Sequence, residues 1–97
     1  MAAYVIADIE VLDFAKFQEY LQAIPAIVEQ CGGRFLVRGG TAQVLEQGLQ
    51  PHRVVLLEFP TVQQAQDWWN SPAYAAIKPI RHASARSHLN ILVEGVQ

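Results

Sequence analysis

Two histidines and a glutamate are the residues of this sequence with the most versatile chemistry. His52, Glu58 and His88 each fall in a segment that alternates as a β-strand, and counting alternate residues puts all three on one face of a sheet. Imidazole has a pKa of about 6.5, so either histidine could exchange protons near neutral pH. The three could in principle bind a metal ion. Nothing in their spacing requires one, and we expect no metal site and no cofactor.

Two arginines form a second candidate feature. The predicted strand 34–38 lies between two glycine pairs, and alternation places the side chains of Arg34 and Arg38 on the same face. Arg38 could bind an anionic group of a ligand. Arg34 could instead pair with Glu58 across a hairpin, which would be a structural ion pair. Both interpretations stay open at this point.

Bulk composition limits the class of protein. The chain has 97 residues, enough for a single domain over 1–97, with net charge −2 and 16% charged residues; about a quarter is usual. No run of Lys or Arg provides a nucleic-acid footprint. The single cysteine, Cys31, excludes an intrachain disulfide. Without a signal peptide pattern or an apolar run of membrane-spanning length, we expect a soluble, cytoplasmic protein that binds neither nucleic acid nor membrane.

Hydrophobic periodicity predicts the elements that must position these residues. Asp13, Thr61 and Ser71 are good N-caps for three helical segments, and Gly32 or Gly33 should end the first helix. Apolar residues at every second position indicate strands. The strands are expected at residues 4–11, 34–38, 52–59 and 87–94.

Prolines and a polar connection complicate this pattern. Pro25 should kink the first helix, and Pro79 should interrupt the last one. We therefore expect residues 80–86 to be irregular or to add one further turn. The connection after residue 38 could contain a short strand around Val44 and Leu45.

The order of elements predicts an α+β fold. The succession βαββαβ is the ferredoxin-like pattern, a four-stranded antiparallel sheet with helices on one face. Alternation assigns an almost entirely apolar set of side chains to the helix-covered face. That set is Val5, Ala7, Ile9, Phe35, Val37, Val55, Leu57, Phe59, Leu89, Ile91 and Val93.

The second face of the sheet is also too apolar for water. Ile6, Leu36, Val54, Leu56 and Leu92 fall there, and each would gain roughly 1.5–3 kcal/mol from full burial. We expect a homodimer through this face, closing into a dimeric α+β barrel that encloses a small-molecule cavity. The candidate pocket residues are Tyr4, Asp8, Arg34, Arg38, His52, Glu58, Trp68, Tyr74, His88 and Asn90.

Four motifs, in this order, resemble the DUF1330 family of unknown function. They are Gly32–Gly40, Arg53–Pro60, Ala65–Tyr74 and Ile77–Arg81. The resemblance implies the dimeric α+β barrel superfamily, which includes cofactor-free monooxygenases, muconolactone isomerase-like proteins and haem-binding relatives. It assigns no catalytic role to any residue. The family-motif positions are Arg34, Arg38, Arg53, Glu58, Trp68, Ser71, Tyr74 and Arg81.

Three functions compete. The first is a homodimer that binds a small apolar or anionic ligand, with a cofactor-free monooxygenase or isomerase as its catalytic form. Arg38 would then bind the anionic group, and Trp68 and Tyr74 would line the wall. His52 or His88 would move protons. The second is a non-catalytic structural or stress-related module. The third, a haem enzyme, would need His88 as the iron ligand.

Overall fold

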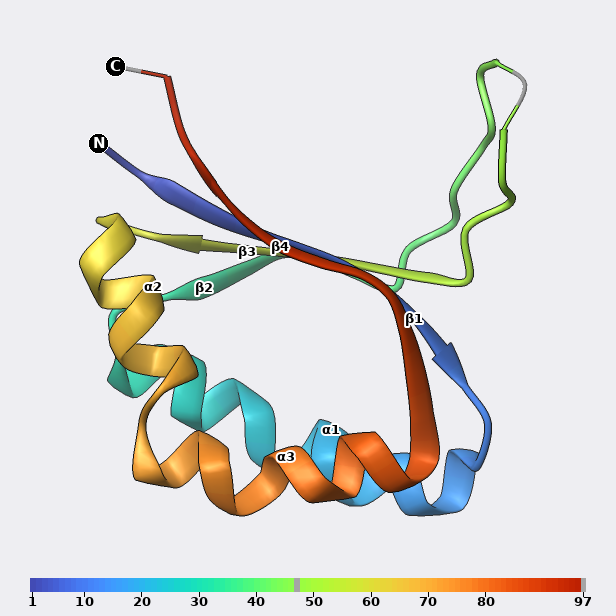
Figure 1. The fold of residues 1–97 in the computed structure, drawn as a ribbon, viewed down its shortest axis with the longest axis horizontal. Coiled ribbons are helices and arrows are strands. Elements are labelled where there is room, and N and C mark those ends of the chain that lie inside the picture. Colours follow the sequence, from blue (N-terminus) through green and yellow to red (C-terminus); the bar gives the residue numbers. More distant parts are fainter. Residues whose placement is uncertain (47, 97) are drawn as a thin grey trace.

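The computed structural model describes residues 1–46 and 48–96 (Figure 1). Strands and helices follow one another along the chain in the order βαββααβ. The elements are β1 (Ala3–Val11), α1 (Phe14–Gln30), β2 (Arg34–Arg38), β3 (Arg53–Phe59), α2 (Val62–Trp69), α3 (Pro72–Ser84) and β4 (Ala85–Glu94).

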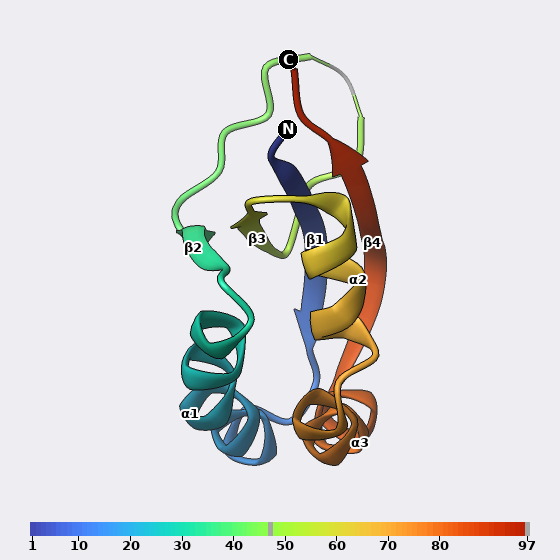
Figure 2. The same ribbon diagram turned by 90° about the vertical axis from the view of Figure 1, so that its left-hand side faces the viewer.

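The strands form one antiparallel sheet in the order β2-β3-β1-β4. The helices all lie against the same face of this sheet, and Figure 2 shows α1 and α3 side by side beneath it. The two ends of the chain meet, because the Gly95 N–H donates to the Ala2 carbonyl at 2.7 Å. The expected ferredoxin-like α+β fold is confirmed, with two consecutive helices before the last strand.

Each helix begins at a capping side chain that the sequence identified. Asp13, Thr61 and Ser71 each accept a hydrogen bond from the backbone N–H three residues later, which satisfies a donor left free at the helix start. Gly32 follows α1 with a φ of +82°. Glycine adopts this left-handed conformation without steric cost, so α1 can end and the chain can turn into β2.

Two local expectations were wrong, the interruption of the last helix at Pro79 and the short strand around Val44, whereas the alternative of a further helical turn after Pro79 was correct. α3 continues through Pro79 to Ser84, so residues 80–84 are helical and β4 begins directly afterwards. Pro79 costs the helix a hydrogen bond, but buried side chains on both sides of it hold the helix against the rest of the protein. α1 also continues past Pro25 to Gln30, and the kink expected there stays a prediction. Residues 40–46 form no strand around Val44, and their connection stands away from the body (Figure 1).

A β-bulge in β2 reverses the face of its last residues. Arg34 lies opposite Glu58, but Arg38 lies opposite Val55, because the register shifts between Phe35 and Val37. One extra residue in a strand turns every later side chain to the other face. The expectation that Arg34 and Arg38 share a face was therefore wrong. Arg38 faces the helices.

A second bulge does the same to β4. Asp8 lies opposite Leu89 and Ile9 opposite Ser87, so His88 is the extra residue. Asn90 consequently lies opposite Ala7, on the helix side of the sheet. The sequence had placed Asn90 and Leu92 on the second face, and that assignment was wrong. The assignment of Val37, Leu89, Ile91 and Val93 to the helix-covered face was wrong for the same reason.

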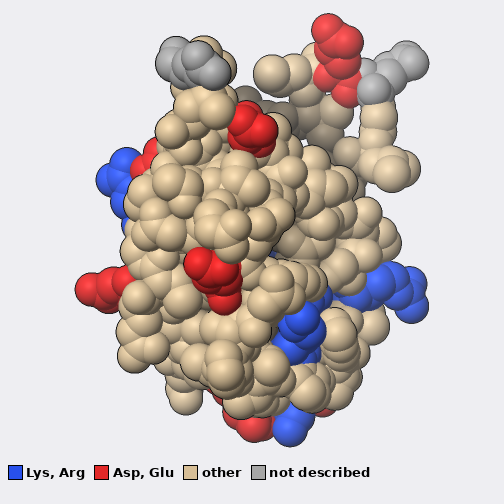
Figure 3. All heavy atoms as spheres, turned by 60° about the vertical axis from the view of Figure 1, so that its left-hand side comes forward, with Lys and Arg blue, Asp and Glu red and all other residues tan. Residues whose placement is uncertain are grey.

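We call the face without helices the open face. Charged side chains are sparse over much of the surface visible in Figure 3. Leu89, Ile91 and Val93 are 40–43% exposed on the open face. Its apolar residues are Ile6, Val37, Val54, Leu56, Leu89, Ile91 and Val93. No helix in the described part of the chain is both long and apolar enough to cross a membrane.

Candidate functional site

A cavity of about 170 Å³ lies between the sheet and the helices. Its walls are mainly apolar side chains of β1, β3 and α1. The rings of Trp68 and Tyr74, 4.5 Å apart between centroids, form an aromatic part of the lining. Asn90 contributes an amide from β4. The arrangement combines an apolar interior with a few polar groups, as small-molecule sites do.

Three arginines line this cavity. Arg38 comes from β2, Arg53 from β3 and Arg81 from α3, and no Asp or Glu lies among the described lining residues. Within residues 1–46 and 48–96, none of the three forms an ion pair with a carboxylate. The guanidinium of Arg38 stacks over Phe35, with Cζ 4.1 Å from the ring centroid. The site therefore carries positive charge that the described side chains do not neutralise.

The guanidinium of Arg53 packs against Gly39, whose backbone is in the left-handed conformation. Gly39 has a φ of +69°, and a Cβ atom built there would lie 2.7 Å from Cζ of Arg53. Gly39 thus provides the space that the guanidinium occupies. The Nε atom of Arg53 is buried and has no hydrogen-bond partner in the structure. A buried donor without a partner is costly, so a hydrogen-bond acceptor placed beside this Nε would stabilise the protein.

Arg81 is fixed by hydroxyl groups instead. It is 5% exposed, and its Nε donates to the Tyr74 hydroxyl at 3.3 Å while Nη1 donates to Ser87 Oγ at 2.7 Å. The Tyr74 hydroxyl also lies 2.9 Å from that of Tyr20. Burial raises the pKa of Tyr20, which keeps its hydroxyl protonated. Trp68 Nε1 is a second buried donor without a partner at this cavity.

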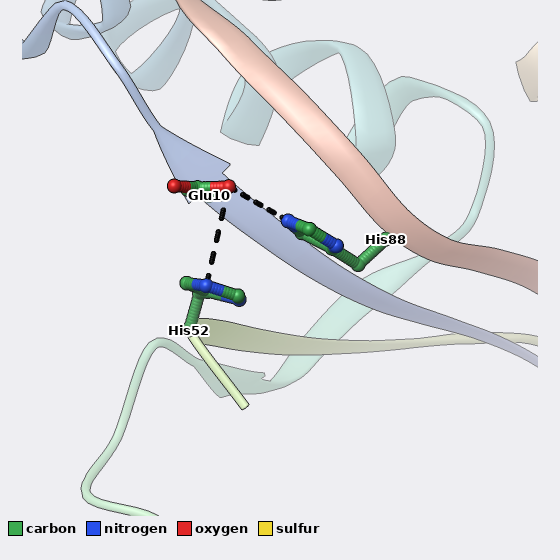
Figure 4. A group of neighbouring side chains, drawn as sticks. All are labelled: Glu10, His52 and His88. Carbon is green, nitrogen blue, oxygen red and sulfur yellow. Dashed lines mark hydrogen bonds and ion pairs between the residues drawn. The ribbon is translucent and has the colours of Figure 1, made fainter. Parts of the chain in front are cut away.

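A separate polar cluster lies on the open face. Figure 4 shows Glu10 from β1 between His52, just before β3, and His88 at the β4 bulge. His88 Nε2 lies 2.7 Å from Glu10 Oε1, and His52 Nε2 lies 4.0 Å from the same oxygen. The two histidines share this face with Glu58, as expected, but the carboxylate beside them is Glu10. Tyr4, the β1 residue opposite Glu58, is six positions from Glu10 along the strand, which is about 20 Å.

Glu58 belongs to the ion pair expected across the hairpin. Its Oε1 accepts from Arg34 Nε at 2.8 Å and its Oε2 from the Tyr4 hydroxyl at 3.1 Å. These two hydrogen bonds lower the pKa of Glu58. The pair lies on the open face, away from the cavity, so it supports the structural interpretation of Arg34.

The structure divides the candidate pocket residues between two faces. Arg38, Trp68, Tyr74 and Asn90 line the cavity, and so do the family-motif residues Arg53 and Arg81. Ser71 caps α3. The others lie on the open face: Tyr4, Asp8, Arg34, His52, Glu58 and His88.

Sequence reasoning missed Arg53 as a cavity residue and Glu10 as the partner of the histidines. Arg53 did leave a signal, because it stands at the start of a strand face that is otherwise apolar. Glu10 left no such signal in the sequence. His52 and His88 belong to the other two segments beside β1, and the register in which those segments pair with β1 decides which carboxylate the histidines approach.

The strand order β2-β3-β1-β4 in an antiparallel sheet, with the helices on one face, defines a ferredoxin-like α+β protein. In this protein a basic cavity lies between the sheet and the helices. More narrowly, the chain belongs to the family described as Domain of unknown function (DUF1330), whose profile matches residues 2–96. The family resemblance is confirmed.

Solved structures show the same fold. A protein of unknown function from Rhodopseudomonas palustris, RPA0582, has a TM-score of 0.80 at 15% identity, with 99% of this chain and 83% of that one covered. Its methylated form gives 0.79 at 14% identity, with coverage of 99% and 82%. HapK from Hahella chejuensis gives 0.65 at 16% identity, with coverage of 97% and 92%. The search of curated proteins gives no match.

Proposed function

We propose that this protein binds a small, largely apolar anion in the cavity between its sheet and helices. The observation that carries the proposal is Arg53, which lines the apolar cavity and has a buried Nε without a hydrogen-bond partner. Arg38 and Arg81 line the same space. A carboxylate or similar group would satisfy the buried donor and neutralise part of the charge. We therefore assign the arginines to the anionic end of the ligand and the aromatic rings to its apolar body.

The volume of the cavity limits the ligand. An engineered apolar cavity of about 150 Å³ binds benzene, so about 170 Å³ accommodates a compound of one ring. Drug-sized ligands occupy pockets of about 300 Å³ or more. The proposal is therefore limited to compounds such as aromatic monocarboxylates.

Binding, rather than catalysis by histidine, is the function we favour. His52 and His88 lie on the open face, on the other side of the sheet from the cavity. The proton-transfer role considered for them would need a ligand on that face, and neither histidine is among the described residues that line the basic cavity. His88 as a haem ligand has the same difficulty, because it too is not among the described residues that line the cavity.

An NMR titration tests this proposal with benzoate as probe and benzamide as its neutral counterpart. We expect benzoate to shift the amide resonances of residues around the cavity and benzamide to bind more weakly. Arg53→Met removes a charge-assisted hydrogen bond worth about 1.5–3 kcal/mol, so it should weaken benzoate binding by roughly 10- to 150-fold. Arg34→Met, on the open face, is the control. Equal binding of the two probes, or equal effects of the two variants, would contradict the proposal.

We further propose that the protein forms a homodimer through the open face. Ile6, Val54 and Leu56 are half-buried at its centre, and Leu89 and Ile91 are exposed beside them. Contiguous apolar surface of this kind is usually covered by a partner. A second copy of the same face supplies a complementary apolar surface, and two sheets can pack face to face.

Light scattering after size-exclusion chromatography tests the homodimer. We expect the mass of two chains for the wild type and of one chain for Leu56→Lys, which places a charge in the middle of the open face. Leu45→Lys is the matched control, because Leu45 is 91% exposed in the connection between β2 and β3. A wild-type protein with the mass of one chain at micromolar concentration would overturn the proposal.

A further inference from the structure

The cluster on the open face brings three potential metal ligands together from separate parts of the chain. The ligand atoms of Glu10, His52 and His88 all lie within 4.8 Å of one another (Figure 4). The two imidazole rings are stacked, with centroids 4.4 Å apart and planes 13° from parallel. All three residues come from one chain, and none lines the cavity. The inference drawn from them therefore does not depend on the anion. The cluster shares the open face with the proposed dimer contact, and Glu10 lies four positions along β1 from Ile6 at the centre of that contact, which is about 13 Å.

We propose that Glu10, His52 and His88 bind a divalent transition-metal ion of the class that includes Zn²⁺. Two neutral imidazoles and a carboxylate are typical ligands of such ions. They leave the remaining coordination positions to water. In the single chain these side chains are 31–40% exposed, so an ion can reach them from solvent.

The distances suit an ion of this size. Zinc binds nitrogen and oxygen at about 2.0–2.2 Å, which separates two tetrahedral ligands by about 3.3 Å. The Glu10 oxygen lies 2.7 Å from one imidazole nitrogen and 4.0 Å from the other, so the observed separations bracket this value. Coordination would need shifts of about 1 Å in half-exposed side chains.

A hydrogen bond alone explains only half of the cluster. His88 is bonded to Glu10 at 2.7 Å, but His52 Nε2 lies 4.0 Å from the same oxygen, too far for a hydrogen bond. An ion between them would contact both rings and the carboxylate. It would take the place of the proton that His88 donates to Glu10, so binding releases a proton.

Asp8 supports the orientation of His52. One oxygen of its carboxylate accepts the His52 backbone N–H at 2.8 Å, and the other lies 3.6 Å from Nδ1. A carboxylate hydrogen-bonded to the remote nitrogen is the usual arrangement around a metal-binding histidine. At 3.6 Å the Asp8 oxygen is beyond hydrogen-bond distance of Nδ1, so its effect on the ring is electrostatic. Nε2 is the nitrogen directed toward Glu10.

The charge of the cluster also favours a cation. Glu10 supplies a carboxylate beside both imidazoles on the open face. Arg86, opposite Glu10 on β4, is the nearby positive charge, and Asp8 offsets it. The β4 bulge contributes geometry, because it leaves His88 outside the strand pairing and free to turn toward Glu10.

Calorimetric titration of the chelator-treated protein with ZnCl₂ tests the inference. We expect one ion per chain, and at least tenfold weaker binding in His52→Ala, His88→Ala and Glu10→Gln. His82→Ala is the matched control, since it removes a histidine of α3 outside the cluster. Thermal unfolding of every variant, followed by circular dichroism, shows that each one folds.

Cobalt gives a second measurement. Co²⁺ bound by the wild type should show a visible absorption band that is lost in His88→Ala and retained in His82→Ala. Asp8→Asn should weaken Zn²⁺ binding by about 10- to 100-fold, as the loss of a supporting carboxylate does. No binding of Zn²⁺ at one ion per chain, or equal losses in His82→Ala and His88→Ala, would overturn the inference.

Discussion

Replacing Gly39 by alanine should destabilise the protein and disturb the cavity together. Gly39 has a φ of +69°, and a side chain in this left-handed region costs roughly 1–2 kcal/mol. Alanine recovers about 0.4–1 kcal/mol by restricting the unfolded chain. The net loss is about 1 kcal/mol, which lowers the unfolding midpoint of a domain this size by about 4–8 °C.

The same methyl group would displace Arg53. The new Cβ would lie 2.7 Å from Cζ and 3.2 Å from Cγ of that side chain, so the guanidinium must move away from its position in the cavity. Benzoate binding should weaken along with stability. Thermal unfolding followed by circular dichroism and the NMR titration measure the two effects.

Gly40 is the matched control for this substitution. A Cβ built at Gly40 meets no heavy atom within 4 Å, and its φ lies outside the left-handed region. Gly40→Ala should therefore leave both the unfolding midpoint and benzoate binding almost unchanged. If the two alanine variants unfold at the same temperature, the reasoning about Gly39 is wrong.

Three further predictions concern side chains with defined partners. Tyr74→Phe should lower the free energy of unfolding by about 1–3 kcal/mol more than Tyr20→Phe, because it leaves two buried groups unpartnered; equal urea midpoints would contradict this. The pKa of Glu58 is lowered in the folded protein, so its carboxylate stabilises the fold above the usual glutamate pKa of about 4.3. That stabilisation disappears as pH falls through the lowered value. Glu58→Gln should therefore melt below the wild type at pH 7, and this difference should shrink as the pH is lowered stepwise below 4; a constant difference would refute the assignment. Thr61→Ala removes the cap on Gln64 N–H and should cost about 0.5–2 kcal/mol, measured by urea unfolding against Thr41→Ala in the exposed connection.

The order of elements and the helix starts could be predicted because they depend on local chemistry. Asp13, Thr61 and Ser71 cap the helices as expected, since a short polar side chain at that position satisfies a backbone donor wherever the helix lies. The end of α3 could not be predicted in the same way. Pro79 opposes the helix locally, and only packing against the rest of the protein keeps the helix intact.

The candidate site could be predicted only in part, because two bulges interrupt the alternation. Arg34 was correctly paired with Glu58, because Arg34 comes before the extra residue of β2. Arg38 and Asn90 were assigned to the wrong face, because each follows an extra residue. No residue type marks the bulges in this sequence. Strand pairing decides where the extra residue is accommodated.

Each bulge also means that the strand can lose one residue at a defined position without changing what it presents to the cavity. Leu36 is the extra residue of β2 and has no partner on β3. Deleting it would leave Val37 opposite Leu56 and Arg38 opposite Val55, so Arg38 would still face the helices. Two relatives could thus differ in length by one residue in this strand and still place the same cation in the cavity. Comparisons of such relatives should therefore align the paired residues on both sides of Leu36.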